Sequence, residues 1–362
     1  MIAIDCRSLQ DDSRFRGIGT VIRSIIQHLP NRDQYVLFGE AGTDFNSYGI
    51  EKILFRPPSQ KKNYGIKLAQ FLQSCHVKHF HFMAQYNIPD HFDFPYSVTV
   101  HDLFNEYLLT NKKKYQQVLS PMVQKLKKAK HIIAISEYTK RMIEEQFNQP
   151  KVSVIYNGFN STILEDSKTN IELETLSITE PYILYMGNFE TRKNFLGAIR
   201  GFLEFRKKNT SYQLVACTGH QPLILPPTIW WLLMKNKRNI KLKSFIDSIE
   251  LANIYNKASA LLFPSFAEGF GLPILEAMSV QTLAVTSNTT SLPEVGKDAV
   301  AYVDPNNPID ISRGLDSVIN DQQLQRELLS KIPSTLNSFQ ILEQAKMYDI
   351  KLNEILNINH FQ

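Results

Sequence analysis

The sequence contains little cysteine. Its three cysteines, Cys6, Cys75 and Cys217, are scattered over 362 residues and form neither a CxxC pair nor a cysteine–histidine spacing suited to zinc. Their arrangement excludes a disulfide framework and a zinc module. Such a small, odd set favours a reducing compartment.

Long hydrophobic runs and strong charge are also absent. Apolar runs such as IWWLLM at 229–234 are far shorter than the about 20 residues that a membrane-spanning helix needs. The start, MIAIDCRS, is apolar only as far as Asp5, which predicts a first strand rather than a signal peptide. The net charge of +5 is too small to indicate nucleic-acid binding. We therefore expect a cytoplasmic protein without a nucleic-acid partner.

The chain has no fixed-period repeat, but short apolar runs alternate with helical patterns along its whole length. Helical spacing is clearest at 20–29, 136–147, 194–208 and 272–280, and Ser136 is a good N-cap. The predicted strands lie at 1–6, 34–39, 76–82, 96–102, 131–136, 152–157, 181–188, 212–217, 240–246, 260–265, 282–287 and 299–304. This alternation predicts an α/β protein with two Rossmann-like, doubly wound parallel-sheet domains facing a cleft.

The domain boundaries follow from composition. A polar segment at 160–180 interrupts the pattern and is typical of a linker. We predict an N-terminal domain at 1–165, a C-terminal domain at 166–340, and a final helix at 341–362 that packs back on the N-terminal domain. Ligands are expected at the carboxyl ends of the strands.

The most informative stretch is EGFGLPILE, which follows the predicted strand at 260–265. Two glycines allow close backbone approach to a ligand, and Pro273 suits the first turn of a helix. The amides of that helix N-terminus suit phosphate, and Glu268 and Glu276 suit sugar or ribose hydroxyls. Taken singly, Glu276 also fits a first-turn dipole charge and Glu268 a solvated loop residue.

A second motif, GNFETRKN at 187–194, follows the first strand of the predicted C-terminal domain. Arg192 and Lys193 are placed to stabilise a leaving diphosphate in the same cleft, although a basic pair is more often a solvated surface feature.

A third motif, RGIG at 16–19, resembles a dinucleotide fingerprint, with Glu40 at nearly the right distance. The fingerprint fails because Ile22 occupies the third glycine position and the glycines lie well past the strand. A backbone nest that contacts phosphate or sugar fits better.

A fourth motif, TVHDLF at 99–104, places His101 at the end of an apolar strand. There it can donate to a sugar hydroxyl or assist a proton, or it is a structural histidine bonded to backbone.

Together these motifs, with AISEYTKR, VIYNGF, SNTTSLPEV and AYVDP, resemble the retaining group 1 (family 4) glycosyltransferases of GT-B architecture over nearly the whole chain. RGIG, HDLF and ETRKN look most like mannosyltransferases and rhamnosyltransferases of bacterial surface polysaccharides. The resemblance implies transfer of a hexose, with GDP-mannose as the donor, to a glycan or lipid-linked acceptor with retained configuration. No D-x-D is present, so no metal or other cofactor is expected.

The resemblance also implies residue roles. Four residues would act at the reacting centre: His101, Arg192, Lys193 and Glu268. The remaining residues would contact the nucleotide-sugar: Gly17, Gly19, Gly187, Asn188, Phe245, Ile246, Gly269, Phe270, Gly271, Leu272 and Glu276. Asn188 departs from the usual family pattern, and 219–239, with PPTIWW, is atypical and has no assigned role.

Three alternatives remain. The first is an inactive relative that binds a nucleotide-sugar or stabilises a partner enzyme. The second is a nicotinamide dehydrogenase, which the failed dinucleotide fingerprint disfavours. The third is a sugar-nucleotide epimerase, which would need no acceptor. The lysine-rich segment 111–131, which has no Asp or Glu, suits either contact with an anionic membrane at its inner face or a solvated helix face.

Overall fold

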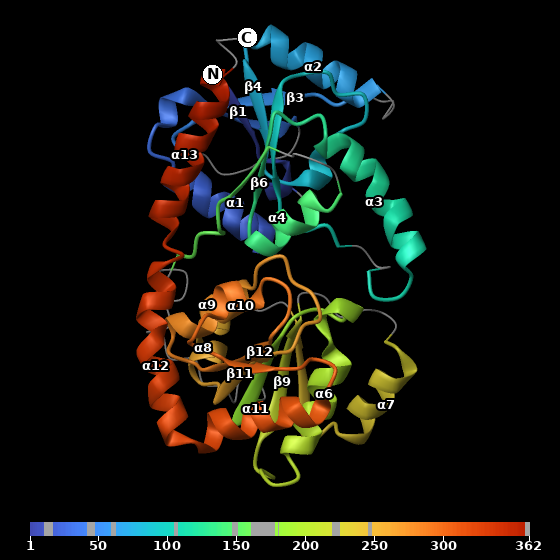
Figure 1. Cartoon of the computed structure of the whole chain (residues 1–362), viewed down its shortest axis with the longest axis vertical. Coiled ribbons are helices and arrows are strands. Elements are labelled where there is room, and N and C mark those ends of the chain that lie inside the picture. The colour runs from blue at the N-terminus through green and yellow to red at the C-terminus, as the bar shows by residue number, and fades with distance from the viewer. Residues whose placement is uncertain are drawn as a thin grey trace. The chain divides into compact units, whose positions relative to one another are not determined.

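The computed structural model describes residues 1–10, 17–41, 48–58, 63–104, 108–146, 151–160, 178–179, 181–218, 225–244 and 248–358. The chain divides into two compact units. Unit 1 comprises Met1–Phe159 with Phe339–Gln362, and unit 2 comprises Asn160–Ser338. Figure 1 shows helices around a twisted sheet in each unit. The predicted boundary at 165/166 and most of the predicted linker lie outside the described residues.

Unit 1 contains a parallel sheet of seven strands in the order β3-β2-β1-β4-β5-β6-β7. The strands are β1 (Ile2–Asp5), β2 (Tyr35–Glu40), β3 (Glu51–Phe55), β4 (His79–Phe82), β5 (Tyr96–Val100), β6 (His131–Ala134) and β7 (Val152–Val154). Six of them were predicted. β3 was missed because this edge strand starts with two charged residues and has no continuous apolar run.

The helices of unit 1 are α1 (Gly17–His28), α2 (Tyr64–Ser74), α3 (Lys112–Leu126), α4 (Glu137–Glu144) and α13 (Ile341–Ile358). The N-cap prediction at Ser136 is confirmed, because its side chain accepts a hydrogen bond from the Thr139 amide. α13 packs against α1. Its Asp349 carboxylate accepts hydrogen bonds from the Tyr35 hydroxyl at 2.7 Å and the Asn31 amide at 2.6 Å.

Unit 2 contains a parallel sheet of six strands in the order β10-β9-β8-β11-β12-β13. The strands are β8 (Tyr182–Met186), β9 (Gln213–Thr218), β10 (Ile240–Ser244), β11 (Ala260–Phe263), β12 (Ala284–Ser287) and β13 (Ala301–Val303). The helices are α6 (Phe195–Phe205), α7 (Pro227–Lys235), α8 (Ser248–Asn256), α9 (Leu272–Ser279), α10 (Leu292–Gly296), α11 (Pro308–Asn320) and α12 (Gln322–Asn337). All six predicted strands are present, and the prediction of two doubly wound parallel sheets is confirmed.

The strand order places a topological switch point in each sheet. In unit 1 the order reverses between β1 and β4, and in unit 2 between β8 and β11. Loops that follow these two strands diverge to opposite faces of the sheet and leave room for a ligand at the carboxyl edge. β11 is entirely buried, as its continuous run of apolar residues predicted. The two motifs GNFETRKN and EGFGLPILE therefore flank one switch point, that of unit 2.

None of the helices in the described part of the chain combines the length and the apolar character that a bilayer crossing requires.

Candidate active site

The loops after β8 and β11 are joined at the switch point of unit 2. The Phe266 amide donates a hydrogen bond of 2.8 Å to the Arg192 carbonyl. Asn194 adds a second link, since its buried side-chain amide donates to the carbonyls of Pro264 at 2.9 Å and Pro305 at 2.7 Å. These bonds tie together the ends of three strands, so the positions of the charged side chains on the two loops are coupled.

Glu268 lies between two cations. Lys193 Nζ is 2.7 Å from Glu268 Oε1 and 2.9 Å from Oε2, and Arg192 Nη1 is 3.1 Å from Oε2. Arg192 is also paired with the exposed Glu190, at 2.8 Å from Nε to Oε2. The structure thus brings Arg192, Lys193 and Glu268 into one ion cluster, as expected if they act together.

This cluster keeps Glu268 ionised. Its side chain is buried, with the residue only 6% exposed, and burial alone would raise the pKa of the carboxyl. The charges and hydrogen bonds of Lys193 and Arg192 outweigh burial and hold the pKa of Glu268 below its ordinary value. A buried carboxylate with fixed cationic partners can accept hydroxyl hydrogen bonds without first losing a proton.

The loop after β8 is shaped by one buried tyrosine. The Tyr185 hydroxyl donates to the carbonyls of Asn188 at 3.3 Å and Lys193 at 3.1 Å. Gly187 has φ of +153°, and a Cβ there would lie 3.1 Å from that hydroxyl, so a side chain would displace the loop. The Asn188 side chain is occupied by Glu190, with which it exchanges hydrogen bonds.

The loop after β11 leads directly into α9. Ser291 Oγ bonds the carbonyls of Glu268 and Phe270, both at 2.8 Å, and the Glu268 amide donates to Thr290 Oγ1 at 3.1 Å. Gly271 is the N-cap of α9 at φ of +127°. Leu272 and Pro273 then form the first turn, as predicted, so the positive end of the helix dipole lies beside the ion cluster.

Glu276 pairs with a tyrosine. Its Oε2 accepts a hydrogen bond of 2.6 Å from the hydroxyl of the fully buried Tyr255 on α8. Burial raises the pKa of Glu276, and the Tyr255 bond opposes that rise. Because only one oxygen is engaged by Tyr255, the carboxyl retains acceptor capacity for a ribose.

His101 lies in unit 1, directly after β5, and it is buried. Its Nε2 donates to the Met83 carbonyl at 2.8 Å, since a carbonyl can only accept. Burial lowers the pKa of His101 against the opposing effects of the Met83 bond and Asp102. The neutral ring therefore leaves Nδ1 as a hydrogen-bond acceptor.

The nest predicted at RGIG is wrong for the two glycines. Gly17 and Gly19 are the first and third residues of α1, which starts three residues before the predicted helix. Neither has positive φ, so they do not form the alternating backbone of a nest. The first-turn amides of α1 offer anion contacts instead. Arg16, Phe245 and Ile246 lie outside the described residues, so the predicted base-lining position at 245–246 is not described.

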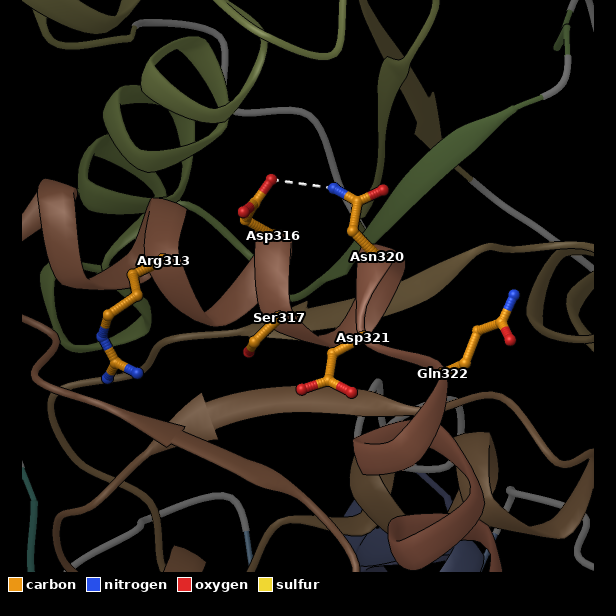
Figure 2. Close-up of a pocket in the computed structure, with 6 residues that line it drawn as sticks. All are labelled: Arg313, Asp316, Ser317, Asn320, Asp321 and Gln322. Carbon is orange, nitrogen blue, oxygen red and sulfur yellow. Dashed lines mark hydrogen bonds between the residues drawn. The ribbon is translucent and has the colours of Figure 1, made fainter.

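Unit 2 also has a surface depression of about 640 Å³, and Figure 2 shows the residues that line it. It is lined by Arg313, Asp316, Ser317, Asn320, Asp321 and Gln322. α11 starts shortly after the carboxyl end of β13 and runs back along the sheet, so these residues lie toward the opposite edge. The depression is therefore separate from the ion cluster.

Within the described ranges, no group of three or more His, Cys, Asp or Glu side chains is arranged to hold a metal ion.

Five residues that hold the site in shape were not predicted from the sequence, namely Tyr185, Asn194, Tyr255, Thr290 and Ser291. Asn194 alone carried a usable signal, because asparagine tolerates the left-handed conformation that it adopts here at φ of 53° and is a good N-cap. Tyr185 acts from β8 on the loop that follows it. The other three contact residues 21 to 23 positions away in the sequence.

The chain is similar to known glycosyltransferases in sequence and in fold. Residues 15–162 match the model of glycosyltransferase family 4, and residues 166–333 match the model of the glycosyl transferases group 1. The chain is 33% identical over 201 residues to O-antigen chain mannosyltransferase B of Escherichia coli, which covers 51% of this chain and 50% of that protein. Over 214 residues it is 29% identical to O-antigen chain mannosyltransferase RfbU of Salmonella typhimurium, covering 58% of this chain and 56% of that protein. The matches span about half the length of these curated relatives.

Among solved structures, Anabaena HepE in complex with UDP and glucose has the same fold, with a TM-score of 0.73 at 15% identity over 97% of this chain and 99% of that one. The two doubly wound sheets are those of the GT-B architecture. Since the two family models together match most of the sequence, one on each side of residues 163–165, the chain belongs to the group 1, family 4 glycosyltransferases.

Proposed function

We propose that this protein transfers a hexose from a nucleotide-sugar to a glycan or lipid-linked acceptor, with retention of configuration and with GDP-mannose as the donor. The observation that carries the proposal is the position of Glu268 between Lys193 and Arg192 at the switch point of unit 2. It combines acceptors for sugar hydroxyls with donors for a diphosphate in one cluster.

The cations serve the leaving group. As the bond between the anomeric carbon and the phosphate oxygen breaks, negative charge grows on the diphosphate. Lys193, Arg192 and the amides at the start of α9 stabilise that charge, and they are held in place before the reaction by the loop contacts. Glu268 orients the sugar, and Glu276 accepts from the ribose beside its bond to Tyr255.

Configuration is retained when the acceptor attacks the anomeric carbon on the same face from which the leaving group departs. A bond forms between the acceptor oxygen and the anomeric carbon, and the acceptor proton passes to the departing phosphate oxygen. No protein nucleophile is assigned, and we propose that no metal ion is needed. His101 accepts a hydrogen bond from a hydroxyl of the reacting sugar through Nδ1, which positions the ring without proton transfer.

Two similarities support the choice of donor. Two relatives are named as mannosyltransferases of O-antigen chains. The HepE structure was determined with UDP and glucose, which supports a nucleotide-sugar as the donor class. Within that donor class, we propose mannose as the sugar and guanine as the base.

Turnover with a panel of nucleotide-sugars tests this function. We expect GDP-mannose to be consumed only when an acceptor is present, and NMR of the product to show the anomeric configuration of the donor. Thermal-shift measurements with GDP, UDP, dTDP and ADP report base preference separately. A shift with UDP alone would refute GDP-mannose and leave hexose transfer standing, whereas an inverted product would refute the retaining route.

The second candidate is an inactive relative that binds a nucleotide-sugar or stabilises a partner enzyme. The acidic and basic residues of the site are present, which disfavours it. Nucleotide binding without turnover over the whole donor panel would support this alternative. Consumption of the donor without any acceptor, by isomerisation of its sugar, would instead indicate an epimerase.

We also propose that the protein acts in the cytoplasm at the inner face of the membrane, where a lipid-linked acceptor would be presented. The start of α3 supports this, because Lys112, Lys113 and Lys114 are all exposed. Lys125 of the same helix is instead paired with Asp90 at 2.8 Å, so only part of the lysine-rich segment offers an unbroken basic surface.

A further inference from the structure

An exposed pair of tryptophans marks the surface of α7 in unit 2. Trp230 is 55% exposed, Trp231 is 54% exposed and Met234 is 52% exposed, whereas Ile229 is the buried residue of this helix. Exposure of large aromatic side chains in one cluster costs solvation free energy unless a partner covers them. These are also the two tryptophans of the whole sequence.

The surroundings of the tryptophans are positively charged. Residues 225–244 contain no Asp or Glu and carry five cations, which are Lys235, Lys237, Arg238, Lys241 and Lys243. Lys235 Nζ lies 4.8 Å from the centroid of the Trp231 ring. The first three cations are fully exposed at the end of α7. Aromatic residues and basic groups are therefore presented on the same segment.

The position of α7 leaves it accessible. It connects β9 to β10, and β10 is the edge strand of the sheet. Figure 1 shows α7 at the periphery of unit 2. Its nine residues start at Pro227 and are too few to cross a bilayer, so a bilayer could take up only its outer face.

We propose that α7 docks on an anionic lipid bilayer, with Trp230, Trp231 and Met234 in the headgroup region and the cations on lipid phosphates. Tryptophan is favoured at this depth because its ring is apolar and its N–H remains hydrogen-bonded. The uninterrupted positive charge favours an anionic lipid surface over a protein partner, whose interface would need matching acidic residues. This assignment gives a role to the atypical segment 219–239, and it does not depend on the proposed transfer reaction.

The two tryptophans make a direct experiment available. Because they are the whole tryptophan complement, intrinsic fluorescence of the full chain reports on α7 alone. We expect mixed phosphatidylglycerol–phosphatidylcholine vesicles to shift the emission maximum to shorter wavelength and to protect the rings from acrylamide. Pure phosphatidylcholine vesicles should have little effect, and high salt should reverse the shift. Brominated lipids should quench the emission.

Charge and ring variants separate the two contributions. Replacing three cations together (Lys235→Gln, Lys237→Gln and Arg238→Gln) should weaken vesicle binding on the order of a hundredfold, since each surface cation contributes about 1 kcal/mol. The matched control (Lys207→Gln, Lys208→Gln and Lys331→Gln) changes as many exposed lysines elsewhere on unit 2 and should retain most of the binding. Trp230→Ala with Trp231→Ala, measured by vesicle sedimentation, should weaken binding by roughly tenfold or more.

Three results would overturn the proposal. They are an unchanged spectrum with anionic vesicles at low salt, sedimentation of the double tryptophan variant equal to that of the parent, or loss of binding in the control variant alone. A shift that grows with protein concentration in the absence of lipid would assign the patch to self-association and would overturn the proposal as well.

Discussion

The switch points of the two sheets have the same topology but different chemistry. In unit 1, Asp5 is the last residue of β1, Arg7 lies two residues later, and the two belong to a closed network. Asp5 accepts from Arg7 Nε at 2.8 Å and Nη2 at 3.0 Å, and Asn87 donates to the same carboxylate at 2.9 Å. Arg7 also donates to the Tyr64 hydroxyl and the Asn87 carbonyl, so each of its three nitrogens is bonded.

In unit 2 the corresponding loops carry two cations for one buried carboxylate. Lys193 and Arg192 both contact Glu268, and the additional acid, Glu190, lies at the exposed side of Arg192. The comparison shows that a switch point provides a location and that the surrounding side chains decide its use. In unit 1 the charged groups of the network bond one another. In unit 2 the cations of the cluster could instead bind a diphosphate, and the carboxylate could instead bind a sugar.

The largest expected effect comes from breaking the unit 2 cluster. Glu268→Ala and Lys193→Ala should each lower the rate of sugar transfer by about a thousandfold, because each removes a fixed charge at the reacting centre. Radiolabelled transfer measures the rate, and circular dichroism checks folding. Glu190→Ala is the matched control, since it removes an exposed partner of Arg192 and should cost little. Parent-like turnover of Glu268→Ala would contradict the assignment.

The same type of change in unit 1 should affect stability instead. Asp5→Ala removes the carboxylate partner of the part-buried Arg7, which keeps only its neutral partners, and should lower the unfolding free energy by about 3 kcal/mol. Transfer per folded molecule should be unchanged. Urea unfolding followed by ellipticity gives the first quantity, and activity at low temperature gives the second. A thousandfold loss of activity in a stably folded Asp5→Ala protein would place unit 1 in the chemistry and erase the distinction.

Unit 1 also contains two buried histidines that share a hydrogen-bond partner. His79 and His81 on β4 share Ser97 Oγ at 2.8 Å each, and His81 also bonds Thr99 Oγ1. Burial, with a smaller effect of Lys130, lowers the pKa of His79 to about 4. Burial, with smaller effects of His79 and His131, lowers the pKa of His81 to about 3.

These shifts set the direction of an acid effect. Since the pKa is lower in the folded state than the ordinary 6.5, the unfolded state binds protons first, and stability falls as the pH drops from 6.5 to about 4. The loss is about 3 kcal/mol for one such histidine. The pKa of Glu268 is lowered from 4.5, so protonation of this carboxylate destabilises unit 2 only at a lower pH.

Hydrogen exchange measured by mass spectrometry should therefore show β4 and β5 losing protection at higher pH than β8 and β11. His81→Gln should reduce the pH dependence of protection in unit 1. His76→Asn changes an exposed histidine and should leave that pH dependence unchanged. Simultaneous loss of protection in both units would argue against the histidine explanation.

The smallest expected effect concerns the asparagine that joins three strand ends. Asn194→Ala removes an N-cap, two buried hydrogen bonds and a side chain suited to φ of 53°, and should cost about 2–3 kcal/mol of unfolding free energy. Asn307→Ala removes only an exposed N-cap of α11 and should cost about 1 kcal/mol. Denaturant midpoints compare the two. Equal costs would mean that the links to Pro264 and Pro305 add no stability.

The sequence was enough to predict the two parallel sheets, twelve of the thirteen strands in the part of the chain that the structure describes, and the placement of two charged motifs at strand ends. It did so because buried strands require continuous apolar runs and because caps and glycine turns act over a few residues. It also indicated that Glu268, Arg192 and Lys193 belong to one site.

The partners of those side chains depend on tertiary contacts. The pairing of Glu268 with Lys193, of Glu276 with Tyr255 and of His101 with the Met83 carbonyl joins residues from separate loops or helices. The incorporation of Gly17 and Gly19 into α1 likewise depended on the fold. Such contacts depend on the approach of segments that are up to about 75 residues apart, and no local pattern encodes the distance at which two loops meet.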